Sequence, residues 1–130
     1  MKILNFYHIG LTIPENAKYI GRYNRKYNLP ESIFKNPYVI KDPKDRGTSI
    51  PKYEKHLWLM LMEEKITKQQ ILELEGYDLV CFCKQPHKEV ACHGDIVKKA
   101  FLYVKNHEKL FDEKLRLYKE WKAKKLDKNS

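Results

Sequence analysis

The chain has 130 residues, 42% of them hydrophobic and 12% aromatic, which suits one packed domain and excludes a disordered, aromatic-poor chain. Lys and Arg outnumber Asp and Glu by 26 to 17, so the charge favours nucleotides, nucleic acid or acidic protein surfaces as partners. All three cysteines lie between Cys81 and Cys92, which excludes a disulfide framework of the secreted kind and predicts a cytoplasmic protein.

The first part of the chain predicts two short strands and a long loop. Residues 2–9 are rich in β-forming side chains and end at Gly10, so we expect a strand there rather than a signal peptide. Residues 17–22 predict a second strand, which ends at a glycine that frees the backbone for a turn. Over residues 23–50, prolines and a glycine interrupt every candidate element, which predicts a long functional loop.

Two helices are predicted next. Pro51, placed in the first turn, and apolar residues at spacings of three and four predict a helix over residues 51–64. Thr67 followed by Gln70 has the spacing of a capping box, which predicts a second helix over residues 68–75. No segment approaches the roughly 20 apolar residues needed to span a bilayer, so we expect no membrane partner.

The last third predicts a strand and two further helices. The nearly continuous apolar run at residues 77–83 is typical of a strand buried on both faces. A helix follows from residue 93 or 94 to about residue 105, with Asp95 in its first turn. Residues 108–126 predict a basic amphipathic helix whose apolar stripe is Leu110, Phe111, Leu115, Tyr118 and Trp121.

The predicted elements indicate an α/β fold. Strands separated by helices favour a small, mainly parallel sheet flanked by helices, in a Rossmann-like arrangement with an extra C-terminal helix. We expect residues 1–106 to form the α/β domain and residues 107–130 a basic helix and tail packed on it. Ligands of parallel sheets bind beyond the carboxyl ends of the strands, where Arg22 and Cys81 lie in this sequence.

A cysteine and histidine cluster is the most unusual feature of the sequence. Cys81 and Cys83 are two apart on a predicted strand, so they share one face, and Cys92 and His93 return at the start of the next helix. Three thiolates and an imidazole are an accepted ligand set for structural zinc, the one cofactor that the sequence predicts. Alternatively, Cys81 and Cys83 are small buried residues of a core strand.

The start of the helix after Cys92 allows two further interpretations. A cysteine directly before a helix is stabilised as a thiolate, which would make Cys92 a reactive group beside His93 and Asp95. The same helix start, at His93 and Gly94, is also a candidate anion site, in which backbone amides and Arg22 hold a phosphate.

The string Gly76-Tyr-Asp-Leu-Val-Cys-Phe-Cys83, followed by Cys92-His-Gly-Asp95, resembles a family known as domain of unknown function 4326. The members of that family are small proteins of bacteria, viruses and some eukaryotes. Tyr19-Ile-Gly-Arg22 and Lys35-Asn-Pro-Tyr38 are similar to further parts of the family pattern, so the resemblance covers about residues 17–100. It implies no established activity, and it implies a Rossmann-like site built from Arg22, Asn36, Cys81, Cys83, Cys92, His93 and Asp95.

The sequence leaves three functions open. The first is binding of a nucleotide or nucleic acid, with or without catalysis, for which the candidate ligand-binding residues are Arg22, Asn36 and Gly94. The candidate catalytic residues for that function are Cys92, His93 and Asp95. The second is a non-catalytic basic nucleic-acid-binding module with structural zinc on Cys81, Cys83, Cys92 and His93. The third is a virus-encoded inhibitor or adaptor that binds a host or cellular protein in the host cytoplasm.

The uneven charge bears on the second of these functions. Residues 18–55 carry ten Lys or Arg against four acids, and residues 114–128 carry seven more Lys or Arg. Basic segments of this kind are candidate contacts for a polyanion. The alternative is a solvated surface that only keeps the protein in solution.

Overall fold

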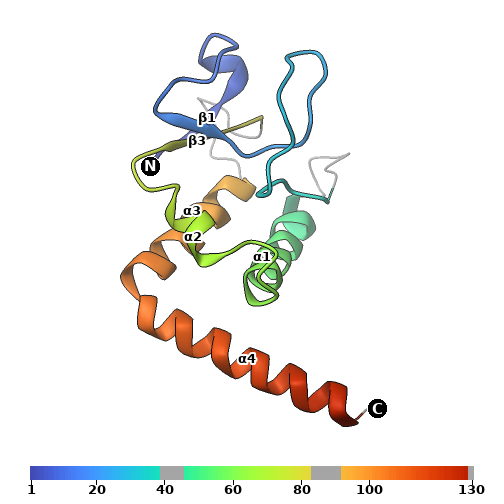
Figure 1. Cartoon of the computed structure of the whole chain (residues 1–130). Coiled ribbons are helices and arrows are strands. Elements are labelled where there is room, and N and C mark those ends of the chain that lie inside the picture. Colours follow the sequence, from blue (N-terminus) through green and yellow to red (C-terminus); the bar gives the residue numbers. More distant parts are fainter. Residues whose placement is uncertain (39–45, 83–91, 129–130) are drawn as a thin grey trace.

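The structure, a computed structural model, describes residues 1–38, 46–82 and 92–128 (Figure 1). In chain order its elements are β1 (Ile3–Asn5), the 3-10 helix η1 (Phe6–His8), β2 (Ala17–Tyr19), α1 (Arg46–Met62), α2 (Lys68–Leu72), β3 (Asp78–Cys81), α3 (His93–Asn106) and α4 (Glu108–Lys128). Among these helices, none combines the length and the apolar character that crossing a bilayer requires. The predicted α/β class is confirmed.

The three strands form one parallel sheet in the order β1-β3-β2, so β3 lies in the centre. Val80 of β3 lies opposite Leu4 of β1 and Tyr19 of β2. Just beyond β2, the Ile20 amide donates to the Val80 carbonyl at 2.9 Å. Because all strands run in one direction, their carboxyl ends meet on the same side of the sheet. The predicted parallel arrangement is confirmed.

The side chains of β3 alternate between two layers. Leu79 and Cys81 enter a core shared with the helices, whereas Val80 belongs to a second cluster with Phe6 and the partly buried Phe82. Figure 1 shows the helices on one side of the sheet and the N-terminal turn on the other. The strand is therefore buried on both faces, as its continuous apolar run predicts.

Both outer strands are shorter than predicted. β1 ends at Asn5, whose side chain accepts a hydrogen bond from the Tyr7 amide at 2.9 Å and caps η1. This local bond competes with a continued strand and turns Phe6 into the second cluster. β2 ends at Tyr19, before the predicted end at Arg22, because the chain turns at Gly21.

The helices after the loop confirm the predicted elements with shifted bounds. α1 begins at Arg46, so Pro51 lies inside the helix and not in its first turn. At this inner position the proline removes one backbone hydrogen bond of the helix. The predicted capping box of α2 is present, because the Thr67 side chain accepts from the Gln70 amide at 3.1 Å. In return, the Gln70 side chain accepts from the Thr67 amide at 2.9 Å. α3 begins at His93, as predicted.

α4 is the predicted C-terminal helix, but its apolar stripe is only partly buried. Phe111 is fully buried and Leu115 packs against the same core, whereas Leu110 is 56% exposed and Trp121 is 54% exposed. At about 100° per residue, Trp121 lies about 80° and Leu110 about 100° around the helix from Phe111, and both lie about 120° or more from Leu115. The predicted stripe was therefore too wide, since only its Phe111 side faces α1 and α3.

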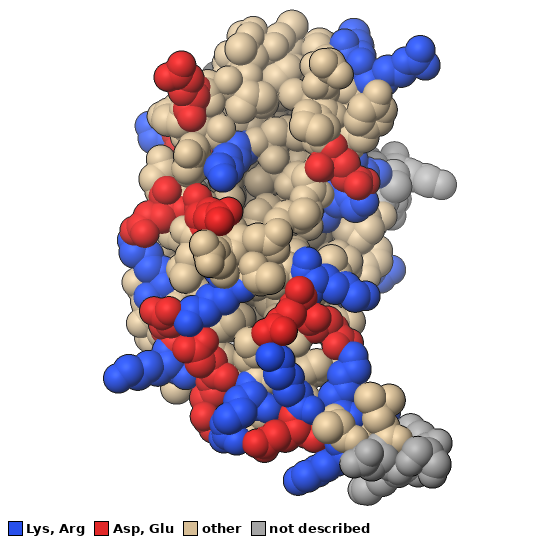
Figure 2. All heavy atoms as spheres, in the orientation of Figure 1, with Lys and Arg blue, Asp and Glu red and all other residues tan. Residues whose placement is uncertain are grey.

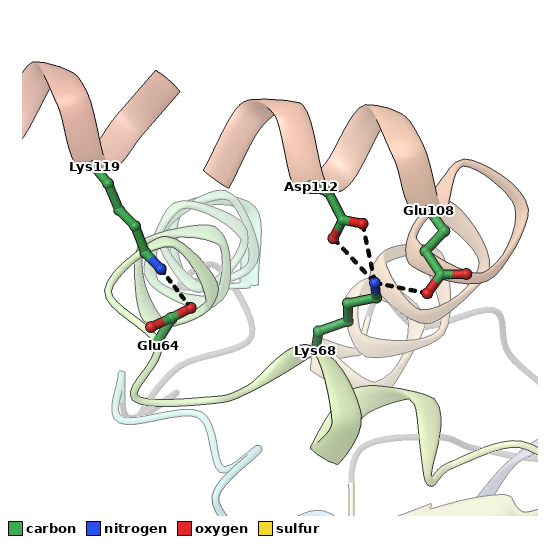
Figure 3. Close-up of polar contacts among 5 residues, drawn as sticks. All are labelled: Glu64, Lys68, Glu108, Asp112 and Lys119. Carbon is green, nitrogen blue, oxygen red and sulfur yellow. Dashed lines mark hydrogen bonds and ion pairs between the residues drawn. The ribbon is translucent and has the colours of Figure 1, made fainter. Parts of the chain in front are cut away.

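Ion pairs also join α4 to the chain around α2 (Figure 3). Lys68 Nζ lies 2.6 Å from a Glu108 carboxylate oxygen and 3.0 Å from one of Asp112. Farther along α4, Lys119 Nζ lies 2.9 Å from a carboxylate oxygen of Glu64. These side chains are partly or largely exposed, and pairs of that kind contribute about 0–1 kcal/mol each. Burial of Phe111 is therefore the main term that holds α4 in place.

Candidate functional site

A pocket of about 240 Å³ lies at the carboxyl ends of β2 and β3. Its lining residues come from the end of β2, the loop that follows, the end of β3 and the start of α3: Tyr19, Gly21, Arg22, Tyr23, Asn24, Asn36, Cys81, Phe82 and His93. In open parallel sheets this side of the strands is where ligands bind. The pocket is therefore the candidate functional site.

Four of the predicted site residues line this pocket: Arg22, Asn36, Cys81 and His93. Cys92, Gly94 and Asp95 lie behind it at the start of α3, and Cys83 lies outside the described residues. The sequence interpretation missed the aromatic part of the lining, Tyr19, Tyr23 and Phe82. A signal for two of them was present, since Tyr19 and Tyr23 flank the predicted turn at Gly21.

The turn after β2 depends on a close approach between Tyr19 and Gly21. The Tyr19 hydroxyl donates to the Arg22 carbonyl, which folds the ring over the turn. A Cβ atom on Gly21 would lie 2.3 Å from the Tyr19 hydroxyl oxygen, so only glycine accepts this ring position. The Gly21 carbonyl in turn accepts from the Ser32 amide at 3.0 Å. These bonds hold Arg22 at the mouth of the pocket.

Among the described residues that line the pocket, Arg22 is the cationic one. Its side chain is exposed, and among the described residues no carboxylate forms an ion pair with it. A guanidinium without an acidic partner keeps its five donors for an external anion, and its planar fork matches phosphate or carboxylate oxygens.

Asn36 lines the pocket but uses both ends of its amide to hold the loop before α1. Its Nδ2 donates to Ser49 Oγ at 3.2 Å, and its Oδ1 accepts from the Tyr38 amide at 2.9 Å. Ser49 Oγ donates onward to the Tyr38 carbonyl at 3.3 Å. Because Asn36 is buried, these bonds give it a positioning role in the pocket wall.

His93 is a buried imidazole with a defined tautomer. Its Nε2 lies 2.9 Å from the Ile20 carbonyl oxygen, and since a carbonyl only accepts, Nε2 carries the proton. Nδ1 then has a lone pair, and it lies 4.0 Å from Cys92 Sγ. The Tyr53 ring packs on the imidazole edge at 5.2 Å between centroids. Burial lowers the pKa of His93, although the bond to Ile20 opposes this, so His93 is neutral at pH 7.

Tyr53 supports His93 as a structural donor. Its hydroxyl donates to the Phe34 carbonyl at 2.6 Å, and its side chain is fully buried. Burial raises the pKa of this hydroxyl, and nearby Cys92 raises it further, so Tyr53 keeps its proton throughout the physiological range. It therefore fixes the loop at Phe34 through this hydrogen bond.

We expect the stability of the protein to fall below about pH 6.5 because of His93. The pKa of His93 is lower in the folded chain than its ordinary value of 6.5 in the unfolded chain. As the pH falls through 6.5, the unfolded chain takes up a proton that the folded chain refuses. The free energy of unfolding then decreases by at most about 1.4 kcal/mol per pH unit for one such group. Urea unfolding at several pH values measures this slope.

The test variant is His93→Gln, which should flatten the slope because it removes the buried imidazole. Burial also lowers the pKa of His56, with Lys35 and Lys65 adding to the effect, so His56→Gln should also flatten part of the slope. An unchanged slope in His93→Gln would contradict the assignment of a neutral, buried imidazole at this position.

Cys92 and Asp95 cap α3. The Cys92 sulfur accepts from the Gly94 amide at 3.3 Å, and the Asp95 carboxylate accepts from the Cys92 amide at 3.3 Å. The Asp95 amide donates to the Cys92 carbonyl at 3.0 Å. The Gly94 and Asp95 amides are thus engaged within the chain, and the Asp95 carboxylate lies at the helix start, while the predicted phosphate site on His93 and Gly94 stays a prediction.

Gly94 has a packing role in the structure, and its predicted ligand-binding role stays a prediction. It is buried where α3 crosses the sheet, and a Cβ atom on it would lie 2.9 Å from Ile3 Cγ2 and 3.2 Å from Ile20 Cδ1. A glycine at this point lets the helix approach β1 and the end of β2 closely. The approach places His93 against the Ile20 carbonyl.

Cys81 and Cys92 bring their sulfur atoms within 3.1 Å of each other in the buried interior. In a tetrahedral zinc site with Zn–S bonds of about 2.3 Å, the sulfurs would lie roughly 3.8 Å apart. Within the described segments, no group of three or more His, Cys, Asp or Glu side chains is arranged to hold a metal ion. With Cys83 outside the described residues, zinc on this cluster stays a prediction.

Comparison with known proteins gives a family and no individual relative. No curated protein and no solved structure matches the chain. A family model described as domain of unknown function (DUF4326) matches residues 6–102, which is 97 of the 130 residues. The match runs from η1 into α3 and so includes every residue that lines the pocket. The resemblance identified from the sequence is confirmed, and the chain belongs to the DUF4326 family.

Proposed function

We propose that the chain binds a small phosphorylated ligand of the mononucleotide type in the pocket at the carboxyl ends of β2 and β3. The observation that carries the proposal is the combination of groups in the lining. Arg22 offers a guanidinium with no acidic partner among the described residues, and aromatic rings and amide side chains lie beside it. A phosphate and a planar base are the groups that such a lining would recognise.

The size of the pocket favours a small ligand. Its volume is about 240 Å³, below the roughly 300–1,000 Å³ of most small-molecule sites. A dinucleotide would extend well outside such a pocket, whereas a mononucleotide could place its base inside and its phosphate at the mouth. This size supports a mononucleotide within the broader class of nucleotide ligands.

Each part of the ligand has a candidate contact. Arg22 is exposed at the mouth and would bind the phosphate. Tyr23 is 62% exposed, so its ring face is accessible for stacking on a base, and Phe82 borders the same space. Asn24 can read a polar edge of the base through its Nδ2 group, since its Oδ1 already accepts from the Tyr27 amide at 3.2 Å. The proposal assigns binding and no reaction.

The distribution of charge favours this pocket over a basic nucleic-acid surface. On the face seen in Figure 2, Lys and Arg side chains alternate with Asp and Glu over the helical half of the molecule. In α4, Lys122 pairs with Glu63, and Arg116 pairs with Glu113 and Glu120. The excess positive charge of the C-terminal segment is thus partly neutralised within the chain, which weakens it as a contact for a polyanion.

The test is calorimetric titration of the full chain with nucleoside monophosphates, and with the matching nucleosides that lack the phosphate. We expect the monophosphates to bind and the nucleosides to bind more weakly. Arg22→Ala should weaken monophosphate binding by about 10–100-fold, since a charge-assisted bond contributes about 1.5–3 kcal/mol. Arg25→Ala is the matched control, because Arg25 is also exposed on the same loop but does not line the pocket.

Two results would contradict the proposal. Equal binding of nucleosides and monophosphates would mean that Arg22 does not read the phosphate. Binding of long oligonucleotides alone, weakened equally by Arg22→Ala and Arg25→Ala, would support the nucleic-acid-binding module instead.

A further inference from the structure

The floor of the pocket contains a pair of thiols that the binding proposal does not use. Cys81, at the end of β3, lines the pocket, and Cys92, the cap of α3, lies directly behind it. Their sulfur atoms are 3.1 Å apart, which is closer than the roughly 3.5–4.0 Å of ordinary contacts between smaller carbon atoms. The two sulfurs come from different elements, so the fold itself brings them together.

We infer that Cys81 and Cys92 form a redox-active pair, in which a peroxide entering the pocket oxidises Cys81 and Cys92 then resolves it to a disulfide. The inference does not depend on which ligand the pocket binds. Both thiols are buried, with Cys81 1% and Cys92 0% exposed, so the different roles follow from the pocket: Cys81 is one of the described residues that line it, and Cys92 is not.

The proposed chemistry takes place in two steps. The Cys81 sulfur attacks one oxygen of hydrogen peroxide, the O–O bond breaks, and Cys81 becomes a sulfenic acid while water leaves with the thiol proton. The Cys92 sulfur then attacks the Cys81 sulfur, the S–O bond breaks, a second water leaves and the S–S bond forms. In total, the two thiols lose two electrons and two protons, and the peroxide is reduced to two waters.

The local geometry suits the second step. The Gly94 amide donates to Cys92 Sγ at 3.3 Å, which holds the sulfur at the helix start facing Cys81. A disulfide needs a separation of about 2.05 Å, so the two sulfurs would have to approach by about 1 Å. The product would tie the end of β3 to the start of α3.

The test uses the full chain with Cys83→Ser, so that only the proposed pair remains. After treatment with hydrogen peroxide, we expect the protein to become lighter by two hydrogen atoms and to lose both titratable thiols under denaturing conditions. Reduction with dithiothreitol should restore both thiols. Proteolysis of the oxidised protein should yield a peptide containing Cys81 linked to one containing Cys92.

Two double variants test the separate roles. With Cys83→Ser and Cys92→Ser together, Cys81 should gain one oxygen that dimedone captures. With Cys83→Ser and Cys81→Ser together, Cys92 should stay unmodified at the same peroxide concentration, because it does not line the pocket. Oxidation of Cys92 as fast as Cys81 would overturn the assigned roles.

Other results would overturn the pair itself. The pair is ruled out if the folded Cys83→Ser protein keeps both thiols in the presence of peroxide. It is also ruled out if the purified chain releases one equivalent of zinc from Cys81 and Cys92. If Cys83→Ser fails to fold, peptide mapping of the oxidised unsubstituted chain replaces it. A Cys81–Cys92 link there supports the inference, and a link that includes Cys83 overturns it. Calorimetry of the reduced protein tests ligand binding separately, so the two proposals can fail independently.

Discussion

Phe111→Ala is expected to lower the free energy of unfolding by about 3–5 kcal/mol, the usual cost of removing a buried aromatic ring. Phe111 is fully buried where α4 meets the helix core, and no other residue of α4 is buried to that extent among those described. The ion pairs of α4 are exposed and cannot replace this contact. Chemical denaturation monitored by circular dichroism measures the change.

Trp121→Ala is the matched control for Phe111→Ala. Trp121 is also an aromatic residue of α4 and belonged to the same predicted stripe, but it is 54% exposed. Its removal should change stability by about 0.5 kcal/mol or less. If the two variants were equally destabilised, α4 would be held by a wider surface than the structure describes.

Gly94→Val is expected to destabilise the fold by about 3 kcal/mol, at the upper end of the usual cost of overpacking. The first added carbon would already lie 2.9 Å from Ile3 Cγ2. This methyl group is bonded to the Cβ atom of a residue in β1, so it has little freedom to move aside. The valine branch would press further between α3 and the sheet, and it would push His93 away from the Ile20 carbonyl. Loss of monophosphate binding should accompany the loss of stability, because His93 lines the pocket.

Lys99→Val separates the effect of position from that of valine in a helix. Lys99 is exposed on α3 and makes only a surface ion pair with Glu54 at 3.1 Å. This variant should lose about 1 kcal/mol or less, from weaker helix propensity and the lost pair. A similar loss in both variants would mean that Gly94 is not needed for close packing.

The parts of the fold that could be predicted are those with a local cause. The capping box at Thr67 and Gln70 is formed by residues three apart, and it is present as predicted. The parallel sheet followed from the alternation of strands with helices, and the burial of β3 followed from its apolar run. These features can be predicted without knowing which helices and strands pack against one another.

Two features were missed for different reasons, one because of a local side-chain bond and the other because of contacts between distant segments. Asn5 looks like part of a strand until its side chain bonds the Tyr7 amide. Trp121 has the spacing of a core residue, but only the position of α4 on the other helices decides which part of the stripe is covered. The sequence pattern alone does not show how α4 is rotated about its own axis relative to the helices on which it packs.

The candidate site shows the same division. Arg22 and Cys81 lie at strand ends, so the sequence could associate them with one side of the sheet, and both line the pocket. The sequence could not indicate that Gly94 packs on Ile3. This contact depends on how α3 crosses the strands.

The lengths of the outer strands bear on how the protein behaves at high concentration. β1 and β2 flank the longer central strand and contain only three residues each. An outer strand with so few open backbone donors and acceptors is a poor template for pairing with the sheet of another molecule. This shortness protects the chain against aggregation by strand addition, even though its central strand is strongly apolar.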